Sequence, residues 1–266
     1  MRRRHDLQAI AACWHLGWSQ AREQRLVLAG QSVLYVIVLA IFWGLWSATP
    51  LQELRDTAPS REALLWYLAI TEWIVFTAGA RYREIEREVT SGAIESALLR
   101  PVPHGVATLA RWAGGCSYQM GVMAVVGVAG AWAMTGSGPP QAALAPLVVL
   151  SSALSIALIL LCQLQLGYAA VWFGSSAPLF WVWQKLLFVF GGLLFPLLLY
   201  PAALRRAAES SPFAAMLSAP AALMFGSDPM GLAVMLMGQL FWLAVLGVLT
   251  VAVGQWATSR LLRVGG

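Results

Sequence analysis

Residues 81–103 read RYREIEREVTSGAIESALLRPVP, and this is the one long polar stretch in an otherwise mostly apolar chain. Within it, Ile85 and Val89 are spaced i,i+4, and so are Ile94 and Leu98. This spacing predicts two short amphipathic helices, each with a narrow apolar face. The stretch therefore predicts a charged helical hairpin.

Three residues mark where the helices of this hairpin end. Gly92 separates the two helices, because glycine readily takes a positive φ at a helix end. Pro101 and Pro103 stop the second helix. A charged hairpin cannot lie in hydrocarbon, so it must face water, and its apolar stripes need a partner protein or the membrane surface. A solvated loop with ordinary charge pairs is the alternative.

The composition predicts an integral membrane protein. Of the 266 residues 59% are hydrophobic and only 11% are charged, against roughly 25% charged residues in a soluble domain. The net charge of +5 does not indicate nucleic-acid binding, because the basic residues are divided among short loops. The three cysteines lie far apart, which supports neither a disulfide framework nor a metal site.

The expected fold is an all-α polytopic membrane protein forming a single transmembrane domain over residues 1–266. We expect an amphipathic helix at the cytoplasmic surface over residues 1–25, since its tryptophans and arginines suit the bilayer interface rather than a cleavable signal peptide. Apolar runs then predict six membrane spans of about 20 residues, with the cytoplasmic hairpin 81–103 between the second and the third. The predicted spans are 26–46, 62–80, 112–134, 142–164, 178–199 and 230–256.

Lysine and arginine counts predict the orientation of the chain. With the N-terminus in the cytoplasm, twelve of these residues fall in cytoplasmic segments and four in external ones. The positive-inside rule therefore places both termini and the hairpin in the cytoplasm. Residues 200–229 would then lie outside, where Pro212 and Pro220 interrupt an apolar run that is too short to span. We expect an external surface helix or a re-entrant segment near the outer end of a pathway.

Two motifs in this order resemble the ABC-2 type transport permeases. The first is the charged helix followed by Ser-Gly-x-Ile and Leu-Leu-Arg-Pro-Val in residues 91–102. The second is the proline-broken segment before the last span, with Pro196, Pro212, Phe213, Pro220 and Gly226. The resemblance covers nearly the whole chain and implies the transmembrane subunit of an ABC exporter in the bacterial plasma membrane.

The resemblance also implies partners. The hairpin would dock on a separate ATPase present in two copies, which would carry the ATP and magnesium, and a second identical or homologous permease chain would complete the pathway among membrane lipids. The residues expected to contribute to coupling are Glu84, Ile85, Glu88, Val89, Gly92, Ile94, Glu95, Leu98, Leu99, Arg100 and Pro101.

No catalytic chemistry is expected on this chain. A phosphate-binding loop needs Gly-Lys-Ser or Gly-Lys-Thr, and the single lysine, Lys185, stands in Gln-Lys-Leu. The three histidines lie near the predicted cytoplasmic surface, and the spans hold no cluster of metal ligands, so we expect neither hydrolytic catalysis nor a metal.

Two ionisable residues fall inside predicted spans, Glu72 in the second and Lys185 in the fifth. Such residues often face a pathway, so both are candidates for it, together with Trp181. They could pair with one another, or Lys185 could extend to the interface while Glu72 meets a nearby polar group.

The leading hypothesis is an ATP-driven exporter subunit, and the cargo is expected to be a lipophilic or amphipathic drug, lipid or peptide because the spans carry few charges. A secondary transporter that uses Glu72 as a proton or ion site is the alternative, although no internal repeat supports it. A membrane scaffold without transport activity is a third possibility.

Overall fold

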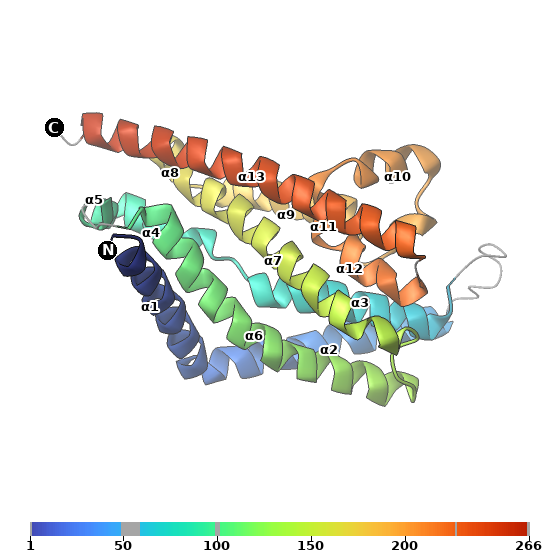
Figure 1. Cartoon of the computed structure of the whole chain (residues 1–266). Helices are drawn as coiled ribbons and strands as arrows, with labels where there is room; N and C mark the ends of the chain where they lie inside the picture. The colour runs from blue at the N-terminus through green and yellow to red at the C-terminus, as the bar shows by residue number, and fades with distance from the viewer. Residues whose placement is uncertain (1, 49–58, 99–101, 227, 265–266) are drawn as a thin grey trace.

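The computed structural model describes residues 2–48, 59–98, 102–226 and 228–264, and this part of the chain is helical without any strand. The long helices from α2 onwards run roughly along one direction in a bundle, whereas α1 meets α2 at a sharp bend (Figure 1). In chain order, the long elements are α1 (Arg2–Glu23), α2 (Arg25–Ala48), α3 (Arg61–Ala78), α6 (His104–Thr135), α7 (Ala145–Tyr168) and α13 (Pro229–Val264). The shorter elements are α4 (Tyr82–Thr90), α5 (Ala93–Leu98), η2 (Ala142–Leu144), α8 (Ala170–Phe173), α9 (Ala177–Phe190), η3 (Leu197–Leu199), α10 (Ala202–Glu209), α11 (Pro212–Met216), α12 (Ser218–Ala222) and η4 (Leu223–Phe225).

Helix α3 is the centre of the bundle. Every residue from Ala63 to Ile74 is buried, and α2, α6, α7 and α12 pack around the helix. Burial on all sides makes α3 the core helix of the bundle. Its first turn is capped by Ser60, whose side chain accepts a hydrogen bond from the Ala63 amide at 3.2 Å. The helix ends at Gly79, whose φ of 58° is readily adopted only by glycine.

Five helical stretches in the described part of the chain are long and apolar enough to cross a membrane: Arg25–Ala48, Arg61–Thr90, His104–Thr135, Ala142–Phe173 and Pro229–Leu261. The protein is therefore a polytopic helical membrane protein. The stretch that begins at Arg61 contains α3 and the polar α4, which the backbone break after Ala78 separates.

The segment expected as the fifth span, residues 178–199, differs from a continuous helix. Helix α9 ends at Phe190 and is followed by Gly191 and by Gly192, which has a φ of 69°. Backbone groups freed inside a membrane must find partners within the protein. Here α3 supplies them, because the Tyr67 hydroxyl donates to the Gly192 carbonyl at 2.6 Å and the Thr71 hydroxyl donates to the Leu193 carbonyl at 2.9 Å. The glycine pair and these two side chains explain why the helix stops.

Helix α1 crosses α6 at a close contact that involves one glycine on each helix. A Cβ atom on Gly17 would lie 1.8 Å from the Arg111 carbonyl oxygen, and one on Gly114 would lie 1.9 Å from the Trp14 carbonyl oxygen. The two backbones therefore touch directly, as small residues allow in membrane helices. The outer face of α1 exposes Leu7, which suits a helix at a membrane surface.

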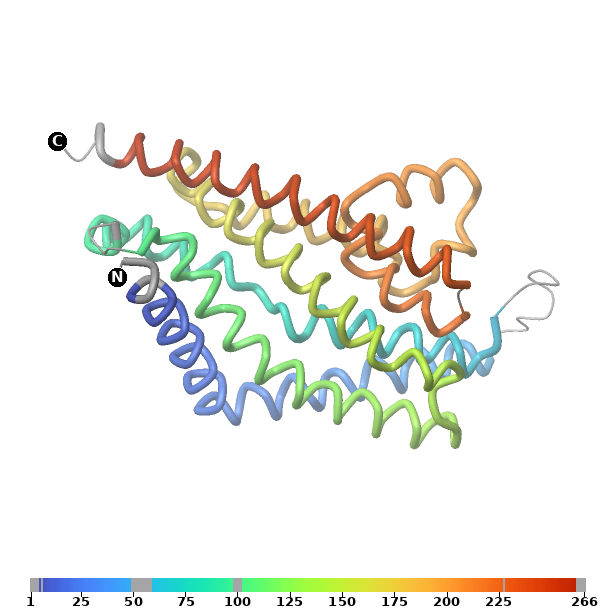
Figure 2. Tube along the Cα trace, viewed as in Figure 1, coloured from blue at the N-terminus to red at the C-terminus, as the bar shows by residue number. Residues whose placement is uncertain are grey.

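The helical bundle has two distinct ends. Helices α4 and α5 lie at the same end as the first and last helical turns of the chain, whereas α10 and α12 lie towards the opposite end (Figures 1 and 2). Residues 200–226 turn back into the bundle, and α11 and α12 pack against α7, with α12 also against α3.

Candidate functional site

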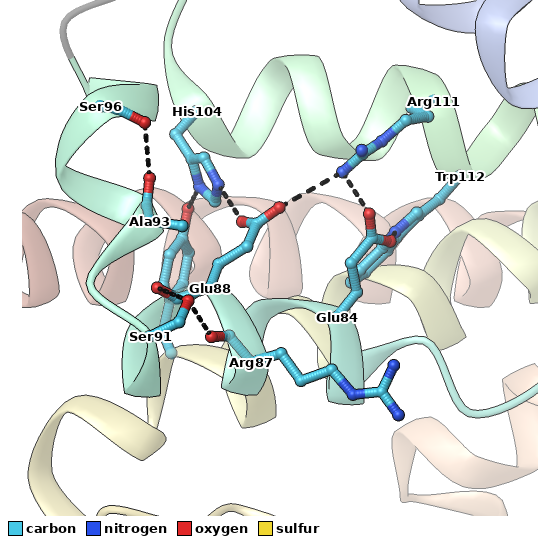
Figure 3. Close-up of polar contacts among 10 residues, drawn as sticks. Glu84, Arg87, Glu88, Ser91, Ala93, Ser96, His104, Arg111 and Trp112 are labelled. Atoms are coloured by element: carbon cyan, nitrogen blue, oxygen red, sulfur yellow. Dashed lines mark hydrogen bonds and ion pairs between the residues drawn. The ribbon is translucent and has the colours of Figure 1, made fainter.

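A cluster of polar side chains joins α4 to the start of α6, and we call it the α4–α6 cluster (Figure 3). Its members are Glu84 and Glu88 from α4 and His104, Arg111 and Trp112 from α6. Arg111 lies between the two carboxylates, and one of its Nη atoms is 2.6 Å from Glu84 and 3.7 Å from Glu88. These five side chains fix the angle between the hairpin and α6.

Each acid of the α4–α6 cluster has a further partner. The Trp112 indole donates to Glu84 at 2.6 Å, and His104 Nε2 lies 2.8 Å from the Glu88 carboxylate. His104 Nδ1 lies 2.9 Å from the Tyr168 hydroxyl of α7, so the histidine connects three helices. Glu84 and Glu88 share a helix face at i,i+4, and therefore both reach α6.

The opposite face of α4 is buried against α7 and α9. Ile85 is fully buried, and a Cβ on Gly167 would lie 2.6 Å from the Ile85 Cβ, so the glycine permits close approach. Tyr82 is stacked on Phe180, with ring centroids 4.2 Å apart. Packing of this quality makes α4 part of the bundle rather than a free loop.

One side chain of α7 holds the backbone at the break between α3 and α4. The Gln163 amide oxygen accepts hydrogen bonds from the Arg81 amide at 2.6 Å and from the Tyr82 amide at 3.2 Å, and its Nε2 donates to the Gly79 carbonyl at 2.7 Å. Gln163 is buried, so these bonds replace the helical ones that the break removes.

A third link joins α4 to the connection before α9. The Glu86 carboxylate accepts hydrogen bonds from the hydroxyls of Ser175 at 2.8 Å and of Ser176 at 2.7 Å. Helix α4 is thus bonded to α6, α7 and the residues that lead into α9, which means that it cannot move alone.

The predicted coupling residues do not form one exposed surface. Ile85 and Ile94 are buried within the chain, and α4 turns its apolar stripe towards α7, so a contact of these two residues with a partner stays a prediction. Glu84 and Glu88 are likewise paired inside the chain, as described above, and Val89 is half-buried. The exposed residues among the eleven are Gly92 and Glu95. The Leu98 side chain and residues Leu99, Arg100 and Pro101 lie outside the described part.

Glu72 and Lys185 occupy different environments. Glu72 is buried in α3 with 6% of its surface exposed, whereas Lys185 is exposed on α9. The Lys185 ammonium lies 5.7 Å from the centre of the Trp181 ring and 5.8 Å from that of Phe188. The ion pairs of the described residues include neither Glu72 nor Lys185, so a pair between the two is not present in this structure.

The segment before the last helix borders a cleft of about 570 Å³ at the end of the bundle opposite the hairpin. Pro196 and Gly226 line this cleft, while Pro212 begins α11 and Pro220 is buried in α12. Phe213 is partly buried against the core.

A buried glutamine fixes this segment against the long helices. Gln239 of α13 donates to the Ser151 carbonyl, the Ser155 hydroxyl and the Ala215 carbonyl at 3.0–3.1 Å, and its amide oxygen accepts from the Ser151 hydroxyl at 2.9 Å. Sequence reasoning missed both Gln163 and Gln239. Their signal was an uncharged polar residue in an apolar run, with Gln165 close to Gln163, and in a membrane helix such a residue points to a partner within the bundle.

These features define a helical membrane protein whose charged hairpin is locked to its spans. Residues 60–261 match the family model described as ABC-2 family transporter protein, and the match contains both the hairpin and the proline-broken segment. The chain therefore belongs to the ABC-2 transporter family and is a permease of an ABC-type transporter. This family generally supplies a non-catalytic transmembrane subunit that associates with an ATPase subunit. A search of curated proteins finds no match to this chain.

Proposed function

We propose that the chain is the permease subunit of an ABC-2 type exporter and that the α4–α5 hairpin transmits the movements of a separate ATPase to the membrane helices. One observation carries this proposal: α4 is bonded to α6 through the α4–α6 cluster, to α7 through Gln163, and to the start of α9 through Glu86. A displacement of the hairpin would therefore move three membrane elements together.

The contact with the ATPase is proposed for the exposed side of the hairpin, around Gly92, Ala93 and Glu95. This revises the earlier expectation for Ile85 and Ile94, which the bundle already covers. Two ATPase copies would bind ATP and magnesium, and each hairpin of a permease pair would contact one of them.

A second permease protomer, identical or homologous, would complete the pathway. The exposed face of α9 supports this part of the proposal, because it combines the apolar Val182 and Leu186 with Trp181 and the cation of Lys185. A charged group on an otherwise apolar membrane helix is costly against lipid, and a protein surface or an aqueous path would lower that cost.

The proposed cargo is lipophilic or amphipathic, such as a drug-like compound, a lipid or a peptide. The cleft at the end opposite the hairpin supports this, since its lining combines apolar residues, among them Trp242, with one polar edge formed by Arg205 and Glu209.

The distribution of arginines supports an arrangement with both termini and the hairpin in the cytoplasm and six crossings, the broken segment 178–199 providing the fifth. The proposed location is the bacterial plasma membrane.

The test is a single charge placed at the end of the hairpin. Ala93→Asp, on the exposed side of the hairpin, should leave membrane insertion intact but reduce recovery of the ATPase with the permease, because a carboxylate buried against a partner costs a few kcal/mol. Leu204→Asp is the matched control, since Leu204 is an exposed leucine on α10 at the opposite end. The readouts are co-purification of a co-expressed ABC ATPase and ATP-dependent efflux. Parental binding and transport by Ala93→Asp would remove the hairpin as the coupling element.

A further inference from the structure

A polar cleft of about 750 Å³ lies between α1, α4 and α6, at the same end as the hairpin. Its walls carry four arginines, which are Arg81, Arg83, Arg87 and Arg111, and three glutamates, which are Glu23, Glu84 and Glu88. The proposed transport function uses the α4–α6 cluster on one wall of this cleft but leaves the cleft itself without a role.

The charges on these walls do not compensate one another. Arg111 is shared by Glu84 and Glu88, and His104 also contacts Glu88, so both acids of α4 are already engaged. Neither Arg81 nor Arg87 takes part in the ion pairs found among the described residues. In Figure 3 the Arg87 side chain extends away from both carboxylates. With Glu23 included, the four arginines of the cleft outnumber its three glutamates by one, so the cleft keeps an excess of positive charge.

Arg81 is the most constrained of these cations. One of its Nη atoms donates to the Gln119 amide oxygen at 2.5 Å, while its Nε is buried and has no hydrogen-bond partner. Its guanidinium lies over Gly115, where an added Cβ would be 3.4 Å from both Nη atoms. A half-buried guanidinium with an unused donor is unfavourable, and an anion paired with its charge in the cleft would offset part of that cost.

Phosphate is the anion whose chemistry fits. A guanidinium presents two parallel N–H donors that match two oxygens of a phosphate group. The position of the cleft indicates a source, because α1 forms one wall and exposes Leu7, Leu16 and Trp18, as a helix at the membrane–water boundary does. Lipid phosphates are concentrated at that boundary, and anionic lipids attract basic groups there.

We propose that the cleft between α1, α4 and α6 binds a phosphate-bearing anion through Arg81 and Arg87, and that the headgroup of an anionic phospholipid supplies it. Such a headgroup would contact the hairpin and the helix at the membrane surface at once. The lipid would then stabilise the arrangement of α4 against α1 and α6.

The test measures thermal unfolding of the purified full-length protein in detergent by tryptophan fluorescence. Short-chain phosphatidylglycerol is titrated, with phosphatidylcholine of the same chain length and inorganic phosphate at constant ionic strength as separate arms. A ligand that binds the native state raises the unfolding temperature as its concentration passes the dissociation constant. Phosphatidylglycerol should do so, and Arg81→Gln should raise the half-saturating concentration about tenfold or more, the loss expected for a charge-assisted pair.

Arg87→Gln should weaken the stabilisation by phosphatidylglycerol less than Arg81→Gln does. Because Arg87 is exposed, this variant should fold, and it tests the anion site even if Arg81→Gln fails to fold. Arg206→Gln is the matched control, since Arg206 is exposed on α10, away from the cleft. Stabilisation by inorganic phosphate with the same dependence on Arg81 and Arg87 would support the anion site and assign it to a soluble phosphate. Equal stabilisation by phosphatidylcholine, no effect of either anion, or identical titrations in all variants would overturn the proposal.

Discussion

Replacing Gln163 by leucine removes the side chain that holds the break between α3 and α4. The variant keeps the volume of the residue but loses the bonds to the Arg81 and Tyr82 amides and to the Gly79 carbonyl. Gly79 is exposed, so its carbonyl can turn to water. The two amides dominate the loss, and at about 1–3 kcal/mol for the buried Tyr82 amide and about 1 kcal/mol for the part-buried Arg81 amide, the free energy of unfolding should fall by about 2–4 kcal/mol.

The assay is thermal unfolding in detergent together with the ratio of cargo exported to ATP hydrolysed in the reconstituted complex. A loss of this size corresponds to roughly 5–15 °C for a chain of this length. The export ratio should fall as well, because the hairpin is no longer fixed to α7. Gln165→Leu is the control, since Gln165 bonds Thr250 and Leu246 of α13 instead and should cost less than half as much. An unfolding temperature for Gln163→Leu within about 2 °C of the parent would show that the bonds of Gln163 do not stabilise the break between α3 and α4.

Two further substitutions probe the contact between α1 and α6 and the hydrogen bonds of Gln239 beside the cleft opposite the hairpin. Gly114→Val should displace α1 from α6, because the added Cβ would lie 1.9 Å from the Trp14 carbonyl oxygen, and limited proteolysis should therefore cut α1 faster. Gly121→Val is the control, since a Cβ on this glycine of the same helix would have nothing within 4 Å, and this variant should be cut like the parent. Equal cutting of the two variants would contradict the close contact between α1 and α6. Gln239→Leu should lower the unfolding free energy by about 2–5 kcal/mol, because several buried groups lose partners, and an unchanged midpoint in a thermal melt would exclude that role.

Much of the fold follows from hydrophobic runs. Long apolar segments predict α2, α3, α6, α7 and α13, because a membrane admits few other structures, and the charged run after α3 predicts a hairpin outside the hydrocarbon. The Ser-Gly-x-Ile motif and the broken segment before the last helix identified the family without any knowledge of packing. The prediction of the ABC-2 family is confirmed by the match over residues 60–261.

The contacts of the candidate site could not be predicted in the same way. The spacing of Ile85 and Val89 shows that α4 has an apolar stripe, but not that Gly167 of α7 leaves room for Ile85 inside the bundle. Similarly, the run 178–199 is apolar throughout, and only the Tyr67 and Thr71 hydroxyls of α3 make a break at Gly192 tolerable. Both outcomes depend on residues distant in sequence, which single-helix patterns do not report.

A site-directed cross-link shows whether the α4–α5 hairpin contacts the ATPase. Glu95 is exposed on α5, so Glu95→Cys presents a thiol to a partner there, in a Cys13→Ser background where the remaining cysteines, Cys116 and Cys162, are buried. A short reagent that joins a thiol to an amine should link this cysteine to lysines of the bound ATPase and so produce a permease–ATPase adduct, and the yield should change when ATP and magnesium are added. Leu204→Cys on α10 should give none. An adduct formed from Leu204→Cys but not from Glu95→Cys would contradict the account.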